Sequence, residues 1–242
     1  MIKGIYHAAA GMIPRMNQQE TVGNNLANVT TTGFKADQRY FRTTLDNKLL
    51  QGGAFGQPVP LTAEQAPLVT DFSQGALAET RNALDIAING QGFFSIETED
   101  SVSYSRNGNF SINGENELVN AQGYRVLGED GPIHIHGRDL VVRANGEIVV
   151  DGKTIATLKI AGFDPAVELK RNGHGYFIPV PEVDPEKPEK IELRPGFLED
   201  SNVDPISEMI QMIELNRNYE SCQKAIQAQD ETLKLAVNDL AK

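Results

Sequence analysis

The end of the chain, over residues 205–242, has the most regular pattern of apolar and polar positions. Asp204 suits a helix cap, Pro205 suits the first helical position, and no glycine or proline follows. We therefore predict one unbroken helix over 205–242. Its seventh-residue column is apolar throughout: Met212, Tyr219, Ile226, Leu233 and Leu240. A seam this narrow favours a partner helix, with a helix lying on its own globular domain as the alternative.

A second column of the same helix lies three residues before the first and is mostly polar. Its members are Met209, Asn216, Gln223, Asp230 and Val237. Polar side chains beside an apolar seam weaken nonspecific association and can fix the register of two helices. We predict that Asn216, Gln223 and Asp230 fix register in this way.

The start of the chain supplies a candidate partner helix. Side chains on one face step by three and four residues through Ile2, Ile5, Ala9, Met12, Met16, Gln19, Val22 and Leu26. Gly4, Gly11 and Gly23 each cost about 1 kcal/mol inside a helix. Pro14 removes a backbone donor, so we predict a kink or a split near Ile13. Such a segment should be mostly unfolded alone and should fold on assembly.

Residues 34–80 have neither a helical nor a strand period. Short apolar pieces alternate with glycine and proline, and residues 51–60 form the loosest part. A structureless stretch of this length is rare inside a compact domain. We therefore predict an extended linker that packs on its neighbours.

Residues 81–204 have the pattern of short β-strands separated by tight turns. Asn-Gly or Asp-Gly dipeptides begin at Asn89, Asn107, Asn113, Asp130, Asn145, Asp151 and Asn172. Both are strong hairpin signals, because both turn residues take positive φ. The segments between them predict an antiparallel meander, sandwich or barrel. The expected strands are 84–88, 93–97, 104–106, 117–120, 124–127, 140–143, 148–150, 157–162 and 175–180.

These patterns together predict an α+β fold. Long N- and C-terminal helices are expected to pair as a coiled-coil-like rod, joined to a mainly antiparallel β central domain. The expected domains are a terminal helical domain of residues 1–33 and 205–242, the linker of 34–80 and a β-rich domain of 81–204.

Composition argues against several classes of function. The 242 residues include 22 Lys+Arg and 33 Asp+Glu, and the net charge of −11 argues against a protein that coats nucleic acid. No apolar run approaches the roughly 18 residues of a membrane span, so we expect no membrane insertion. The first residues lack the apolar stretch of a secretory signal, so we expect no cleaved signal peptide. The single cysteine, Cys222, excludes an internal disulfide and a thiolate zinc cluster.

The candidate chemical motifs are weak. Gly90 and Gly92 resemble the start of a dinucleotide loop, but a strand pattern follows instead of the helix that a phosphate site needs. His134 and His136 share one face of a short extended segment, where two exposed residues are a better interpretation than a metal site. Cys222 has no histidine one turn away, which favours an ordinary helical thiol over a nucleophile. We expect no catalytic residue, no cofactor and no metal.

Four blocks of sequence resemble the axial proteins of the bacterial flagellum, the rod and hook group. Asn24-Asn25-Leu26-Ala27-Asn28, followed by Thr32-Gly33-Phe34-Lys35, is similar to the N-terminal signature of that group. Residues 84–94 resemble its strand–turn–strand block, and residues 104–110 with 118–119 and 123–124 resemble its hairpin block. Residues 196–203, followed by 208–210 and 216–219, resemble its C-terminal block. The four blocks occur in the order found in the family.

The resemblance implies a non-enzymatic structural subunit of the flagellar basal-body rod. It implies that paired terminal helices form an inner tube, with the β-rich domain outside. It also implies self-assembly with copies of itself and with other rod subunits, so that torque passes from motor to hook through the periplasm. Export of the unfolded chain through the flagellar type III export apparatus is a further implication.

Two subtypes of this family fit the chain. The short length and compact middle favour the F-type proximal rod proteins, with the G-type distal rod proteins as the near alternative. A hook protein is disfavoured, because hook proteins carry a larger outer insertion.

The terminal seams and the block around Asn24–Asn28 are the candidate assembly interface. Asparagines suit hydrogen bonds to neighbouring backbone, and an ordinary helix stop is an equally good interpretation of that block. The candidate interface residues are Ile5, Met12, Met16, Asn24, Asn25, Leu26, Asn28, Phe34, Met212, Tyr219, Ile226, Leu233 and Leu240. A competing hypothesis is a soluble dimeric β-domain enzyme or binding module joined by a coiled coil, whose helices would resist protease in dilute solution.

Overall fold

The chain folds into two compact units that are interleaved along the sequence. The computed structural model describes residues 2–39, 68–99, 101–137, 139–164, 167–173, 175–181, 183–188 and 192–240, with helix side chains described from 11 onward and up to 235. The helical unit falls within residues 1–27, 36–71 and 204–242, and the β unit within 28–35 and 72–203. The prediction had instead placed residues 28–33 with the helices and 72–80 in a linker.

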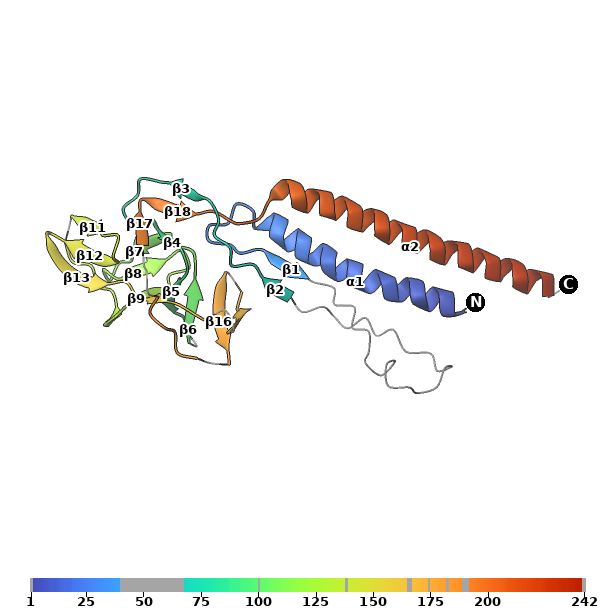
Figure 1. The fold of residues 1–242 in the computed structure, drawn as a ribbon, viewed down its shortest axis with the longest axis horizontal. Coiled ribbons are helices and arrows are strands. Elements are labelled where there is room, and N and C mark those ends of the chain that lie inside the picture. Colours follow the sequence, from blue (N-terminus) through green and yellow to red (C-terminus); the bar gives the residue numbers. More distant parts are fainter. Residues whose placement is uncertain are drawn as a thin grey trace. The chain divides into compact units, whose positions relative to one another are not determined.

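The described residues of the helical unit form two helices and a small ladder. The helices are α1 (Ile2–Ala27) and α2 (Pro205–Leu240), and the ladder pairs β1 (Asp37–Arg39) with β2 (Leu68–Thr70) in antiparallel register. Figure 1 shows α1 and α2 side by side, and their hydrogen-bonded pairs Asn25–Glu208 and Gln19–Asn216 show that they run antiparallel. Of the predicted linker, residues 40–67 lie outside the described residues.

The predicted start of α2 is confirmed. Asp204 Oδ1 accepts a hydrogen bond from the Ile206 amide at 3.1 Å, and the Asp204 carbonyl accepts one from the Glu208 amide at 3.1 Å. The first bond satisfies an amide that has no partner within the helix, and the second is the first bond of the helix ladder.

The predicted split at Pro14 is wrong, because α1 continues from Ile2 to Ala27 with Pro14 inside it. A proline removes one hydrogen bond of the helix ladder and disturbs the carbonyls one turn earlier. The carbonyl that loses its donor is that of residue 10, and the Arg15 guanidinium donates to the next carbonyl, that of Gly11, at 2.5 Å. One lost bond therefore does not end the helix.

Every strand pair among the described residues of the β unit is antiparallel. Its largest sheet has nine strands and contains the ordered path β15-β16-β6-β5-β9-β8-β7, with β10 added beside β9 and β14 beside β5. The other groups are β11-β12-β13, β17-β4 and β18-β3. The strands are β3 (Leu77–Glu79), β4 (Ile86–Asn89), β5 (Phe93–Glu97), β6 (Val102–Ser105), β7 (Phe110–Ile112), β8 (Leu118–Asn120), β9 (Arg125–Gly128), β10 (Gly131–Pro132), β11 (Leu140–Val142), β12 (Glu147–Val150), β13 (Lys153–Thr157), β14 (Ile160–Ala161), β15 (Glu168–Arg171), β16 (Tyr176–Val180), β17 (Glu192–Pro195) and β18 (Phe197–Glu199).

The α+β class and the antiparallel β region are confirmed, whereas the coiled-coil-like rod stays a prediction. The sequence pattern missed several strands, among them β13, β15 and β17, whose side chains are largely polar or exposed. Such strands are held by backbone pairing with apolar neighbours, as β15 is by β16 and β17 by β4. Their own sequence therefore carries little alternation.

The turn dipeptides behave in different ways. Only Asp151-Gly152 among them has positive φ at both residues, 50° and 77°, and it joins β12 to β13 as a two-residue hairpin. At Asn145-Gly146 and Asn172-Gly173 the glycine alone has positive φ. Asn89-Gly90 and Asn107-Gly108 do not connect the two strands of a hairpin. The strand before Asn89-Gly90, β4, pairs with β17, and Asn109 forms an isolated bridge with Asp85.

The core of the β unit lies between its sheets. The larger cluster includes Phe94 and Ile96, which have no exposed surface, and the Phe94 ring meets Phe110 edge-on at 5.0 Å between centroids. A smaller cluster gathers Phe93, Tyr104 and Phe177. This density of buried apolar side chains is sufficient for an independently folded unit.

Candidate assembly site

The predicted apolar column of α2 lies on the side of the helix that is partly covered. Met212, Tyr219, Ile226 and Leu233 are all half-buried. A Cβ atom added to Gly23 of α1 would lie 3.8 Å from Cε of Met212, so the column begins against α1. The side chains of Ile5 and Leu240 lie outside the described residues.

The predicted polar column of α2 lies on the exposed side of the seam, and its role in fixing register stays a prediction. The half-buried positions beside the first column are Glu208, Leu215, Cys222 and Gln229, whereas Met209, Asn216, Gln223 and Asp230 are exposed. A seventh-residue column has neighbours three residues before it and three residues after it, and the sequence pattern does not decide between them. The structure selects the side that contains Leu215. Asn216 still accepts a hydrogen bond from Gln19 at 3.0 Å, at the exposed edge of the helix pair.

The predicted residues of α1 are divided between two sides of the helix. Met12 is half-buried, whereas Met16 is 49% exposed and its neighbour Ile13 is 56% exposed. Of the predicted block at the end of α1, Asn24 is exposed, and Leu26 and Asn28 are half-buried. The periodicity that groups these residues therefore does not correspond to one buried face.

Both polar atoms of the Asn25 side chain form hydrogen bonds within the helical unit. Its side-chain amide donates to the Asp37 carbonyl at 2.9 Å and its Oδ1 accepts from the Asp37 amide at 2.9 Å, so it pairs with β1 as a strand residue would. The same amide nitrogen donates to Glu208 Oε1 at 3.1 Å. The expectation that these asparagines bond to neighbouring backbone is confirmed here.

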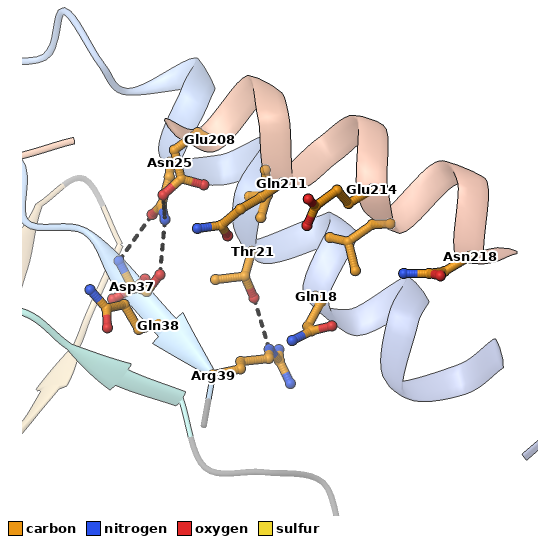
Figure 2. A pocket seen from close by; sticks show the side chains of 12 residues that line it. Gln18, Thr21, Asn25, Asp37, Gln38, Arg39, Glu208, Gln211, Glu214 and Asn218 are labelled. Atoms are coloured by element: carbon orange, nitrogen blue, oxygen red, sulfur yellow. Dashed lines mark hydrogen bonds between the residues drawn. The ribbon is translucent and has the colours of Figure 1, made fainter. Parts of the chain in front are cut away.

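A polar groove of about 460 Å³ lies between α1, α2 and β1. Figure 2 shows amide and carboxylate side chains around it, with Arg39 donating to Thr21 Oγ1 at 2.8 Å. Burial raises the pKa of Glu208 above its usual range, and the hydrogen bond from Asn25 opposes that shift. The groove therefore favours polar backbone or side-chain contacts at the base of the helix pair.

Sequence reasoning missed a second apolar surface on α2. Ile206, Met209, Ile210 and Ile213 are 69%, 51%, 53% and 52% exposed, and helical geometry places them on the side opposite the half-buried Leu215. We call these four residues the outer stripe. Their spacing of three and four residues was a usable signal, but a search for a seventh-residue repeat passes over a patch two turns long.

Phe34 belongs to the core of the β unit. It is 5% exposed, and the Arg171 guanidinium lies 4.7 Å from its ring centre and donates to the Lys35 carbonyl at 2.6 Å. Phe34 is thus covered within its own chain.

Next to Phe34 lies a buried cluster of ions that sequence reasoning also missed. Lys35, Glu199 and Arg106 have side chains that are 0%, 0% and 3% exposed. Lys35 Nζ lies 2.5 Å from Glu199 Oε1, and Arg106 Nη1 lies 3.2 Å from Glu199 Oε2. Burial lowers the pKa of Arg106 and the Glu199 carboxylate opposes that shift. We call these three residues the ion cluster.

The weak chemical motifs take up ordinary positions. His134 and His136 are exposed on either side of the buried Ile135, as expected for an extended segment. Gly92 precedes β5 and has a φ of 139°, so no helix N-terminus follows it. Within the described ranges, no cluster of three metal-ligating side chains is found. Neither described helix is long and apolar enough to span a bilayer.

Comparison with known proteins decides the family. Three family models match: a flagella basal body rod protein model over residues 5–35, a flagellar hook protein FlgE/F/G D1 domain over 87–158 and a flagellar basal body rod FlgEFG protein C-terminal model over 194–239. FlgG of Bacillus subtilis is 30% identical, with 98% of this chain and 99% of the relative covered. FlgG of Agrobacterium fabrum is 31% identical (96% and 97% covered), and FlgF of Rhizobium meliloti is 30% identical (99% and 98% covered).

The chain belongs to the flagellar basal-body rod protein family.

It is therefore a structural subunit of the rod, of F or G type, and its place is the flagellar basal body. Membership of a structural family also argues against the competing hypothesis of a soluble enzyme. The first model covers most of α1 and the turn to Lys35, the second runs from β4 to the region after β13, and the third covers β18 and nearly all of α2. Each of the three matched regions of this rod protein contributes one member of the ion cluster: Lys35, Arg106 and Glu199.

Proposed function

We propose that this rod protein builds the inner tube of the rod with α1 and α2 and carries its β unit on the outside. The observation that supports this most is that α2 has apolar side chains both on its half-buried side and on its exposed side. Met212, Leu215 and Tyr219 lie on the half-buried side, and the outer stripe lies on the exposed side. A helix that packs against a single partner needs only one apolar side. The second apolar side indicates a further contact surface, because exposed apolar patches mark interaction sites.

The partners of the outer stripe are copies of this chain or other rod subunits. A contact between two different surfaces of successive subunits does not close on itself, and so it generates a helical filament. The exposed Ile13 and Met16 of α1 are suitable second surfaces for such a contact. Torque is transmitted because many such contacts hold successive subunits at a fixed register.

The remaining predicted interface residues keep the roles proposed from the sequence. Met12, Asn24, Leu26 and Asn28 would support the assembled helices, as would the seam residues Ile226 and Leu233. Asn25 and Phe34 would act indirectly, since their contacts hold β1 and the start of the β unit in place. Export of the unfolded chain through the flagellar type III apparatus to the periplasm is part of the same proposal.

Between the two subtypes we propose the F type. The alignments with F-type relatives span 244, 247 and 225 positions, whereas those with G-type relatives span 256 to 268. An alignment longer than the 242 residues of this chain contains insertions in the relative. The F-type relatives therefore need fewer insertions to match this chain.

The test is a single charge placed in the outer stripe. Ile213→Asp is expected to leave the purified chain folded, because Ile213 is 52% exposed, and to abolish swimming of bacteria that carry it in place of the native gene. Ala225→Asp is the matched control, since it adds the same charge at an exposed position of α2 away from the stripe. Normal swimming with Ile213→Asp would contradict assembly through this face.

A further inference from the structure

The ion cluster lies where the chain enters and leaves the β unit. The chain passes between its two units four times, at 27/28, 35/36, 71/72 and 203/204. Lys35 is the last residue of the first short passage through the β unit, and Nζ of Lys35 donates to the Ser73 carbonyl at 2.7 Å, just after the chain returns. Glu199, its ion partner, precedes the final exit. The Lys35 ammonium group therefore connects the β-unit segments next to three of these four crossings, at 35/36, 71/72 and 203/204.

Backbone hydrogen bonds around the cluster join the same segments. The Gly33 amide donates to the Glu199 carbonyl at 2.6 Å, and the Gly75 amide donates to Glu199 Oε1 at 2.9 Å. The Asp200 amide donates to the Ala76 carbonyl at 2.8 Å. Glycine is required at two of these positions: a Cβ on Gly33, whose φ is 67°, would lie 2.5 Å from the Arg106 carbonyl carbon, and one on Gly75 would lie 2.1 Å from the Asp200 carbonyl oxygen.

Arg106 connects this junction to the core strands. Its Nη2 donates to the Gly90 carbonyl at 2.7 Å, in the turn between β4 and β5, and its guanidinium lies 5.2 Å from the Phe93 ring centre. The cluster holds two cations and one carboxylate away from water. Moving Glu199 away would leave two buried cations without their ion partner, which is far more costly than breaking an exposed pair.

We propose that the ion cluster is the mechanical joint through which load on the two chain ends enters the β unit. The inference rests on the proposed function, in which the helices carry torque. Force applied through α1 reaches the β unit at residue 28, and force applied through α2 reaches it at residue 203. The Lys35–Glu199 pair connects the segments that begin at these two positions, so that they share the load instead of separating. Lys35, Glu199 and Arg106 are thus positioning residues that make the junction resist shear.

The variant Lys35→Met/Glu199→Gln tests the proposal. It removes the ion pair that connects the two loaded segments, together with the Arg106–Glu199 pair. It leaves the net charge of the cluster unchanged and keeps a side-chain carbonyl for the Gly75 amide. The purified full chain is held by its two ends and its unfolding rate is measured at fixed force. We expect the double variant to raise the unfolding rate of the β unit by about tenfold or more. Glu199→Gln alone, which leaves both cations, is expected to show a larger increase.

Two comparisons make the result decisive. Phe94→Ala lowers equilibrium stability without touching the junction, so at matched equilibrium stability the junction variant should unfold faster under force. Equal rates for the two variants at matched stability, or an unchanged rate in the double variant, would overturn the proposal. The pulling experiment uses isolated molecules and tests the ion cluster alone. Swimming with Ile213→Asp tests the contacts between rod subunits, so failure of one proposal can be told apart from failure of the other.

Discussion

The helical unit and the β unit differ in how much of their apolar surface they cover themselves. In the β unit Ile86, Phe94 and Val126 have no exposed surface. In α2, by contrast, none of the side chains described between 205 and 235 is fully buried. A unit that covers its own apolar groups is stable alone, whereas a unit with half-covered helices gains stability from whatever completes it. The two units thus fit different tasks, one to remain folded and one to be completed on assembly.

The two units also differ in what they bury. Among the side chains of α1 described from residue 11 onward, that of Asn25 is the most buried, at 1% exposed, and it is held by hydrogen bonds to β1. The β unit buries aromatic rings in contact with one another, such as Phe94 against Phe110. Hydrogen bonds contribute less net free energy than the burial of a large apolar side chain, but they require a specific geometry.

The largest expected effect comes from removing a core ring. Phe94→Ala should destabilise the β unit by about 3–5 kcal/mol, because a fully buried aromatic side chain is lost and a cavity remains. Urea unfolding of the purified chain, followed by circular dichroism, measures this loss. The counterpart Ile226→Ala, at a half-buried seam position, should cost clearly less. If the two losses were equal, the contrast between the units would not hold.

A smaller effect separates two turns that look alike in the sequence. Gly152→Ala should destabilise the chain by about 1–2 kcal/mol, because Gly152 has a φ of 77° that side chains with a Cβ rarely adopt. Gly114→Ala is the matched control: both sites have open space around an added Cβ, but Gly114 has no positive φ. Its effect should stay within about 0.5 kcal/mol. Thermal unfolding of the two variants, compared with the native chain, measures both, and similar losses would show that the backbone conformation is not the cause.

The smallest effect concerns pH and the helical unit. Because burial raises the pKa of Glu208, the folded unit binds the Glu208 proton more tightly than the unfolded chain does. The resulting stabilisation is present at low pH and is lost as pH rises through the folded pKa. Lowering the pH from about 7 to about 4 should therefore stabilise the native chain relative to Glu208→Gln, by less than about 1 kcal/mol.

The control for this comparison is Glu214→Gln, which removes a charge from an exposed position lining the same groove. Helix content at 222 nm during thermal unfolding reports on α1 and α2 at each pH. If Glu214→Gln altered the pH dependence of stability and Glu208→Gln did not, the prediction for Glu208 would be wrong.

Regular periods in the sequence were enough to predict the long elements. The run without glycine or proline after Pro205 predicts α2, and the Asp204 cap predicts its start to within a residue. The apolar run at Phe93–Glu97 predicts β5 with the observed bounds. In these segments the local preference and the tertiary environment agree, so the pattern is strong.

Other features depend on partners that the local sequence does not contain. The polar strand β17 exists because β4 pairs with it, and α1 continues through Pro14 although its own propensity predicts a break. The ion cluster joins residues 35, 106 and 199, whose separation along the chain hides any pattern. A buried charge is visible only when its burial is known, and burial is a property of the folded chain.

The sequence by itself determined the long helix α2, the antiparallel β region and, through its motif blocks, the family of the protein. Tertiary structure alone decided which neighbouring column of α2 lies beside Met212, which side of α2 stays uncovered and how Lys35, Arg106 and Glu199 come together. The physical reason is that periodicity records preferences within a few residues, whereas burial, ion pairing and the choice between two equivalent helix faces are set by contacts between distant segments.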